Sequence, residues 1–276
     1  MNRHLTAAFA LLFLPVVMFA DTAEIRISLK LDGSDFIVGE RIRGVIDVAN
    51  PSPDTIRVGF KDSCDSLFVE VFRASDQHQL TLTTKIPFVS PFILKSNEGQ
   101  KLETFLGDHY GLCEPSRYLA KPVLVHGGVR FEGTLRAFDI VEGVQVGKAT
   151  QLFANRKGLQ REFRLLYWNR NHHERLFLAA QDSGISTRRW ETRDLGEILR
   201  IDRPTISVMP QGEVIVLHRI TQDQFVRTEF WSLPKELEFR RNETVDDPAT
   251  ASTSRVRGLY KDGGIKAKEN PWWKFW

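Results

Sequence analysis

The sequence lacks most of the features that identify an enzyme or a nucleic-acid-binding protein. It has only two cysteines in 276 residues, and 38 lysines and arginines nearly balance 35 aspartates and glutamates. Such a balance gives no reason to expect nucleic acid or a strongly anionic partner. The sequence also has no Gly-x-Ser-x-Gly nucleophile motif, no glycine-rich phosphate loop and no His-Glu-x-x-His. We therefore expect a non-enzymatic protein with no cofactor and no metal.

Long apolar runs are also absent after the N-terminus. Residues 1–20 combine a short polar start at Arg3 and His4 with an uncharged apolar stretch from Ala7 to Ala20. This pattern predicts a secretory signal peptide that is cleaved after Ala20, and a retained membrane anchor is the alternative. The mature chain is thus expected to be secreted or periplasmic, in the cell envelope, and soluble or peripherally attached.

The two cysteines, Cys64 and Cys113, both lie in the predicted mature chain. In an exported protein, two cysteines predict one disulfide. It would close a loop of about 50 residues and stabilise the fold by roughly 4 kcal/mol. Two free thiols are the alternative.

Residues 22–143 show short apolar runs separated by turn residues. Between Glu24 and Leu31, apolar and polar residues alternate, and the turn Asp32-Gly33-Ser34-Asp35 follows. Period-two alternation of this kind is typical of a strand with one buried face. Strands continue at near-regular spacing to Val141, without a long helical pattern, and predict a β-sandwich.

This first region resembles the immunoglobulin-like sandwiches of bacterial envelope proteins. The resemblance rests on Val38-Gly39-Glu40, Val48-Ala49-Asn50-Pro51, Arg117-Tyr118-Leu119-Ala120 and Phe138-Asp139-Ile140. It implies a fold and not a function, because such sandwiches serve many unrelated roles.

A linker is expected over residues 143–148, followed by a second antiparallel β domain at 150–241. A shift of 41 residues aligns Leu176 with Leu217, Asp182 with Asp223, and Trp190 with Trp231. We interpret this as a duplication of a unit about the size of a propeller blade. Two blades cannot close a ring, so we expect a small two-sheet module. The predicted fold class is therefore all-β throughout.

Few side chains in this second domain suggest chemistry. His218 and Arg219 end a predicted strand, and Asp223 follows closely, so the three could form an acid–base or anion site. Ordinary loop ion pairs are the alternative. His172-His173-Glu174 is predicted to be a hairpin turn and not a metal site, because adjacent strand residues point to opposite faces.

Tryptophans are the remaining candidates for binding. Trp190 and Trp231 are expected to pack between sheets, or else to present aromatic platforms to glycans or peptides. Residues 242–276 form a polar linker and a C-terminal tail that carries Trp272, Trp273 and Trp276. This tail could fold back on the second domain, dock into another protein, or make peripheral contact with a membrane.

The leading hypothesis is a non-enzymatic exported binding, adhesion or scaffold protein whose partner is an unidentified protein or glycan. A secreted hydrolase with its site at His218, Arg219 and Asp223 is one alternative. A module that resembles a proteinase inhibitor is the other.

Overall fold

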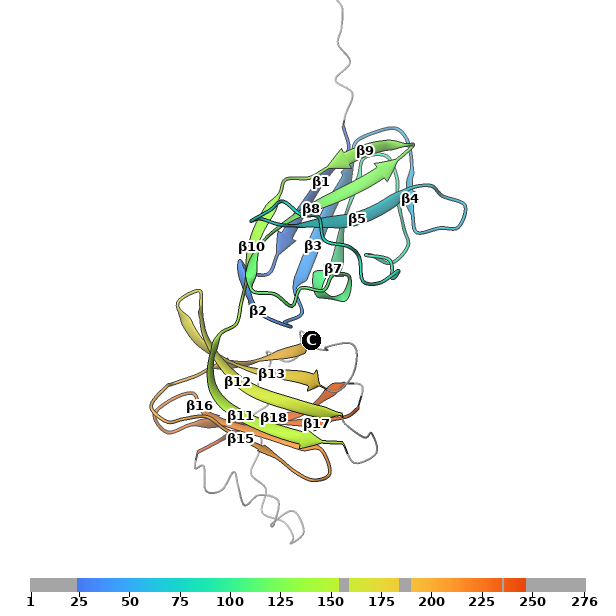
Figure 1. Ribbon diagram of the computed structural model, residues 1–276. Coiled ribbons are helices and arrows are strands. Elements are labelled where there is room, and N and C mark those ends of the chain that lie inside the picture. The colour runs from blue at the N-terminus through green and yellow to red at the C-terminus, as the bar shows by residue number, and fades with distance from the viewer. Residues whose placement is uncertain (1–23, 154–158, 184–189, 235, 247–276) are drawn as a thin grey trace, which may run out of the picture.

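The structure is a computed structural model that describes residues 24–153, 159–183, 190–234 and 236–246. It is all-β, and Figure 1 shows two β units, one above the other, joined where β10 runs into β11. Among the described residues, none belongs to a helix that is long and apolar enough to span a membrane. The predicted signal segment and the tail with Trp272, Trp273 and Trp276 lie outside the described residues.

The first unit is a β-sandwich. One sheet has the order β1-β3-β7; the other has the order β2-β10-β8-β5 with β9 added to β8; β4 and β6 form a separate pair. The strands are β1 (Arg26–Leu31), β2 (Asp35–Ile37), β3 (Arg43–Asn50), β4 (Ile56–Val58), β5 (Ser66–Arg73), β6 (Phe92–Leu94), β7 (Glu98–Phe105), β8 (Ser116–His126), β9 (Val129–Glu132) and β10 (Arg136–Val141), with a 3-10 turn at Leu106–Asp108.

The alternation that predicts the first strand is confirmed. Ile27 and Leu29 of β1 are buried, and their neighbours face solvent. The chain then changes sheets at residues 32–34, within the predicted turn 32–35, so that β1 pairs with β3 and β2 pairs in parallel with β10. Side chains of both sheets fill one core, in which Tyr118 stacks on Phe138 at a centroid distance of 5.6 Å.

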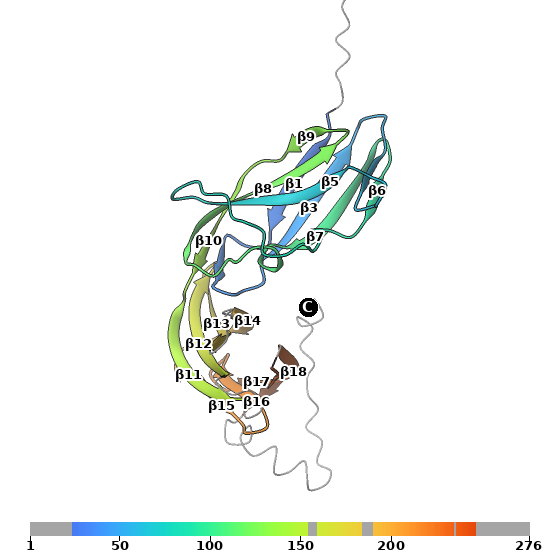
Figure 2. The same cartoon turned by 45° about the vertical axis from the view of Figure 1, so that its right-hand side comes forward.

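The second unit contains two antiparallel four-stranded sheets, β11-β12-β13-β14 and β15-β16-β17-β18. Their inner faces share a core, β11 lies beside β15, and Figure 2 shows both sheets curving around that core. The strands are β11 (Val144–Leu152), β12 (Gln160–Arg170), β13 (His173–Ser183), β14 (Trp190–Glu197), β15 (Thr205–Val208), β16 (Glu213–Arg219), β17 (Phe225–Ser232) and β18 (Leu237–Val245).

Two expectations about this unit need correction. The sequence predicts a linker over residues 143–148, but residues 144–148 belong to β11. The turn at Glu142-Gly143, where Gly143 has φ of +72°, is enough to change the direction of the chain. The two sheets have the same strand order, but the 41-residue shift does not join equivalent positions. Trp190 begins β14, whereas Trp231 lies near the end of β17.

The predicted disulfide is not formed, since Cys64 and Cys113 are both exposed free thiols. Cys64 adjoins Asp65, which contacts His126 at the end of β8, whereas Cys113 precedes the start of β8 at Ser116. A strand rises about 3.3 Å per residue, so an 11-residue strand separates these positions by about 30 Å. A disulfide needs Cα atoms within about 7 Å.

Candidate functional site

The predicted site at His218, Arg219 and Asp223 is not assembled. His218 faces the inter-sheet core with Val214 and Val216, and only 1% of it is exposed. Arg219, the next residue, points to the other face and pairs with Asp202 at 2.6 Å. Asp223 lies exposed in the turn between β16 and β17. The three side chains do not converge on one point, so they cannot act together on a substrate.

Burial determines the chemistry of His218. It lowers the pKa of this imidazole to about 4, and the nearby backbone of Glu197 offsets only part of that effect. Neither ring nitrogen makes a hydrogen bond of good geometry with the described residues. At neutral pH the ring is therefore an uncharged core side chain.

The two tryptophans occupy different places. Trp190 is half-buried against the core of the first unit and against a small apolar cluster formed by Ile37, Leu166, Phe177 and Ala179, and the Arg164 guanidinium lies 5.5 Å from its ring. Trp231 is half-buried on the outer face of β17, with Arg240 at 5.5 Å. The position of Trp190 therefore agrees with the interpretation that it packs in the interior, and not with that of an exposed aromatic platform.

The string at 172–174 belongs to a hairpin, as predicted. Asn171 and His172 have φ of +52° and +66° in the tight turn between β12 and β13, which matches the positive φ values of a type I′ turn. His173 instead pairs with Glu197, at 3.1 Å. No group of three or more potential ligands that could hold a metal ion is found in the ranges that the structure describes.

Asp182 has a role that the sequence did not reveal. It forms a two-pronged ion pair with Arg161 on the neighbouring strand, at 2.6 and 3.0 Å, and both side chains are almost fully buried. The same guanidinium donates to the Ser232 hydroxyl at 3.0 Å and to the Leu233 carbonyl at 2.7 Å. One buried arginine thus links the two sheets of the second unit.

A second arginine, Arg170, is largely buried and joins the two units. It lies at the end of β12 and donates to both carboxylate oxygens of Glu40, at 2.8 and 2.6 Å. Asp35 and Asp194 each lie 3.9 Å away. Burial lowers the pKa of Arg170, but the three carboxylates outweigh that effect and raise it overall. We call residues 35–40, Trp168, Arg170, Trp190 and Thr192 the junction.

The junction also contains neutral contacts. Thr192 donates its backbone N–H to the carbonyl of Gly39 at 2.9 Å and its hydroxyl to the carbonyl of Val38 at 2.6 Å. The Trp168 indole donates to Asp35 at 2.6 Å. Behind these contacts, Ile37 of the first unit packs with Phe177 of the second in a small core. Segment 35–40 thereby covers the free edge of β14.

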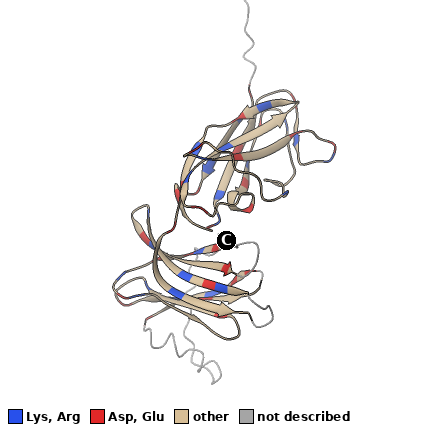
Figure 3. Ribbon diagram, viewed as in Figure 1, with Lys and Arg blue, Asp and Glu red and all other residues tan. Residues whose placement is uncertain are grey.

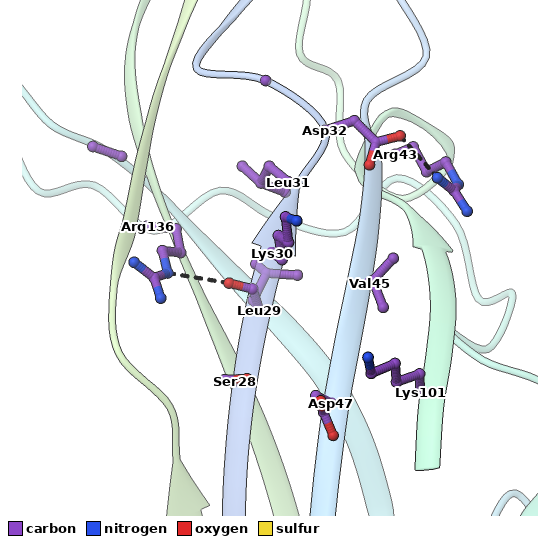
Figure 4. A pocket seen from close by; sticks show the side chains of 12 residues that line it. Ser28, Leu29, Lys30, Leu31, Asp32, Arg43, Val45, Asp47, Lys101 and Arg136 are labelled. Carbon is purple, nitrogen blue, oxygen red and sulfur yellow. Dashed lines mark hydrogen bonds and ion pairs between the residues drawn. The ribbon is translucent and has the colours of Figure 1, made fainter.

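The first unit carries an open groove of about 770 Å³ on the outer face of β1 and β3. Figure 4 shows its polar side chains on β1, β3, β7 and β10, with Arg136 reaching β1 from the opposite sheet. It is lined by Ser28, Leu29, Lys30, Leu31, Asp32, Gly33, Arg43, Val45, Asp47, Lys101, Arg136 and Ala137. Over the rest of the ribbon, charges of both signs are interspersed (Figure 3).

Comparison with known proteins gives no family. No protein-family description matches the sequence, and no curated protein matches it either. Among solved structures, the sporulation control protein Spo0M of Bacillus subtilis aligns with a TM-score of 0.31 and 9% identity, over 62% of this chain and 90% of that one. The CsuC–CsuE chaperone–tip adhesion subunit complex of Acinetobacter baumannii aligns with a TM-score of 0.23 and 11% identity, over 73% and 97%. Likenesses this distant carry no functional argument.

Proposed function

We propose that this chain is an exported, non-enzymatic binding or scaffold protein that holds two β units in one fixed arrangement. The observation that carries the proposal is the junction, where a largely buried Arg170–Glu40 ion pair, backbone hydrogen bonds and a small apolar core act together. A merely flexible connection would not require these contacts. The predicted signal segment supports export to the periplasm or beyond.

The geometry at His218 favours this proposal over the hydrolase alternative. A hydrolase needs an acid, a base or a nucleophile within hydrogen-bond reach of one substrate atom. The three predicted residues instead lie in a core, on an outer face and in a turn. The proteinase-inhibitor alternative stays a prediction for an inhibition assay.

The fixed arrangement is tested by measuring a distance between the units. Spin labels at Lys95→Cys and Glu238→Cys, in a chain with Cys64→Ser and Cys113→Ser, report that distance by pulsed electron paramagnetic resonance. All four positions are exposed or lie in exposed turns. We expect one narrow distribution, which broadens when Arg170 is replaced by alanine. A broad distribution in the chain with Arg170 intact contradicts the proposal.

Export is tested separately by fractionating cells that produce the full chain or a chain without residues 1–20. We expect the full chain outside the cytoplasm and the shortened chain inside it. Chemical cross-linking of the exported protein in intact cells then asks whether it has a partner. If both chains are found in the cytoplasm in equal proportion, the export part of the proposal is wrong.

A further inference from the structure

The groove in the first unit is open because the chain changes sheets beside it. After β1, residues 32–34 carry the chain across to the second sheet, where β2 pairs with residues 139–141 of β10. β1 is consequently the edge of its own sheet, and none of the described strands pairs with it on the side that faces β10. A seam remains between Leu29–Leu31 and Arg136–Ala137, and both segments line the groove.

The backbone of β1 presents unpaired groups to this seam. Asp32 donates its N–H to the carbonyl of Arg43, which shows that the even-numbered residues of β1 bond to β3. The odd-numbered residues therefore direct their N–H and C=O groups toward β10. Arg136 uses its Nε to bond the carbonyl of Leu29 at 3.1 Å. At the Ile27 end of this edge, Gly133 packs against the strand, so that a Cβ there would lie 2.7 Å from the carbonyl oxygen of Ile27.

The side chains of the groove have an excess of positive charge. Lys30, Lys101 and Arg136 have no carboxylate within ion-pair distance among the described residues. Arg43 is different, because Asp32 at 3.0 Å and Glu103 at 2.5 Å neutralise it. Asp32 and Asp47 are the two acidic side chains among the described residues of the lining. The nearly neutral whole chain thus has a local cationic surface, and local charge decides which partner is attracted.

The positions of the cations indicate the shape of the ligand. Lys30 lies on β1 and Lys101 on β7, two strand spacings or roughly 10 Å apart. Arg136 reaches the groove from the other sheet. Cations that are spread in this way match an extended polyanion better than one phosphate group. None of the described residues that line the groove is aromatic, so they offer no ring on which a sugar could stack.

We propose that this groove binds an extended, acidic polypeptide segment. The Leu29 N–H and the backbone groups of Leu31 would pair with the backbone of that segment, and Lys30, Lys101 and the terminal guanidinium nitrogens of Arg136 would pair with its carboxylates. A volume of about 770 Å³ holds several residues. The inference names the kind of partner and rests on the proposed binding role.

The test uses the full exported chain and a fluorescein-labelled peptide that alternates glutamate with threonine. Fluorescence anisotropy should show binding that weakens steeply with added salt, and a lysine–threonine peptide should not bind. The double variant Lys30→Glu with Lys101→Glu should weaken binding by about tenfold or more. The matched control, Lys61→Glu with Lys95→Glu, makes the same charge change at exposed positions outside the groove and should bind as the unmodified chain does.

Three outcomes would overturn the proposal. The first is no binding of the acidic peptide, and the second is an equal loss in both double variants. The third is that hyaluronan or vesicles of phosphatidylglycerol bind through Lys30 and Lys101 while the peptide does not. Circular dichroism of each variant establishes that it is folded. The distance between the units is measured without any ligand. A failure of peptide binding would therefore not affect the proposal that the two units are held in a fixed arrangement.

Discussion

Arg170 and Glu40, which lie 130 positions apart in the sequence, meet in a two-pronged ion pair at the junction. Their side chains are only 14% and 13% exposed, so removal of one partner leaves a charge in a largely dry environment. We expect Arg170→Ala to lower the free energy of unfolding by about 2 to 3 kcal/mol. Urea unfolding measures this loss.

The control for this change is Arg117→Ala. Arg117 and Asp139 form an ion pair of 3.9 Å whose side chains are 66% and 47% exposed. Exposed pairs contribute about 0 to 1 kcal/mol, so this variant should stay close to the unmodified protein. Similar losses in the two variants would show that the junction adds little stability.

Gly39 is the second test of the junction. Its φ is +81°, and a Cβ at this position would lie 2.8 Å from the Cβ of Trp190. Gly128 has almost the same φ, +80°, but no atom lies within 4 Å of its added Cβ. We expect Gly128→Ala to cost about 1 kcal/mol from backbone strain alone. Gly39→Ala should cost at least about twice as much, because Trp190 must also move.

The comparison of these two glycines is made by urea unfolding under identical conditions. The two glycines have nearly the same backbone conformation, but only Gly39 lies close to the other unit. The difference between the two losses therefore measures the contact across the junction. Equal losses would mean that the close approach of Gly39 to Trp190 does not persist in solution.

Asp182 and Asp223 provide a third test, which concerns the predicted duplication. The 41-residue shift aligns the two residues, but they lie in different environments in the structure. Asp182 pairs with Arg161 in a nearly water-free site, whereas Asp223 is exposed in a turn. We expect Asp182→Asn to lower the free energy of unfolding by about 3 kcal/mol, because it leaves Arg161 charged and buried. Asp223→Asn should change it by less than about 0.5 kcal/mol. Thermal unfolding of the pair decides whether the two positions are equivalent.

The strands of this protein could be predicted from sequence because their signal is local. Ile27 and Leu29 alternate with polar residues, and the alternation alone identifies the buried face of β1. β11 gave a weaker signal, because both of its faces are partly exposed and Gly147 interrupts it, so its first half resembled a linker. Burial on one face is what makes a strand visible in a sequence.

The junction could not be predicted in the same way. The segment Val38-Gly39-Glu40 stood out in the sequence as a feature of the sandwich, but nothing local indicates that Glu40 pairs with Arg170. Likewise, the sequence contains Arg161 and Asp182, but nothing in it indicates that both side chains are buried and paired. Periodicity identifies the face on which a side chain lies, and tertiary packing alone determines its partner.

His218 is expected to make the second unit sensitive to acid. The pKa of its ring is about 4 in the folded chain, against about 6.5 when unfolded, so the unfolded chain binds a proton more readily. Stability that is fully present above about pH 6.5 is therefore lost as the pH falls toward 4. The loss amounts to about 2 to 3 kcal/mol by about pH 4.5.

His218→Leu removes this titration and should flatten the decline in unfolding free energy between about pH 7.5 and 4.5 by that amount. Carboxylates also titrate in this range, so the informative quantity is the difference between variant and unmodified protein in urea unfolding at each pH. His78→Leu is the control, because it makes the same substitution at an exposed position outside the core. If His218→Leu keeps the full pH dependence, the ring is not a neutral core side chain, and the inward orientation of His218 on β16 is wrong.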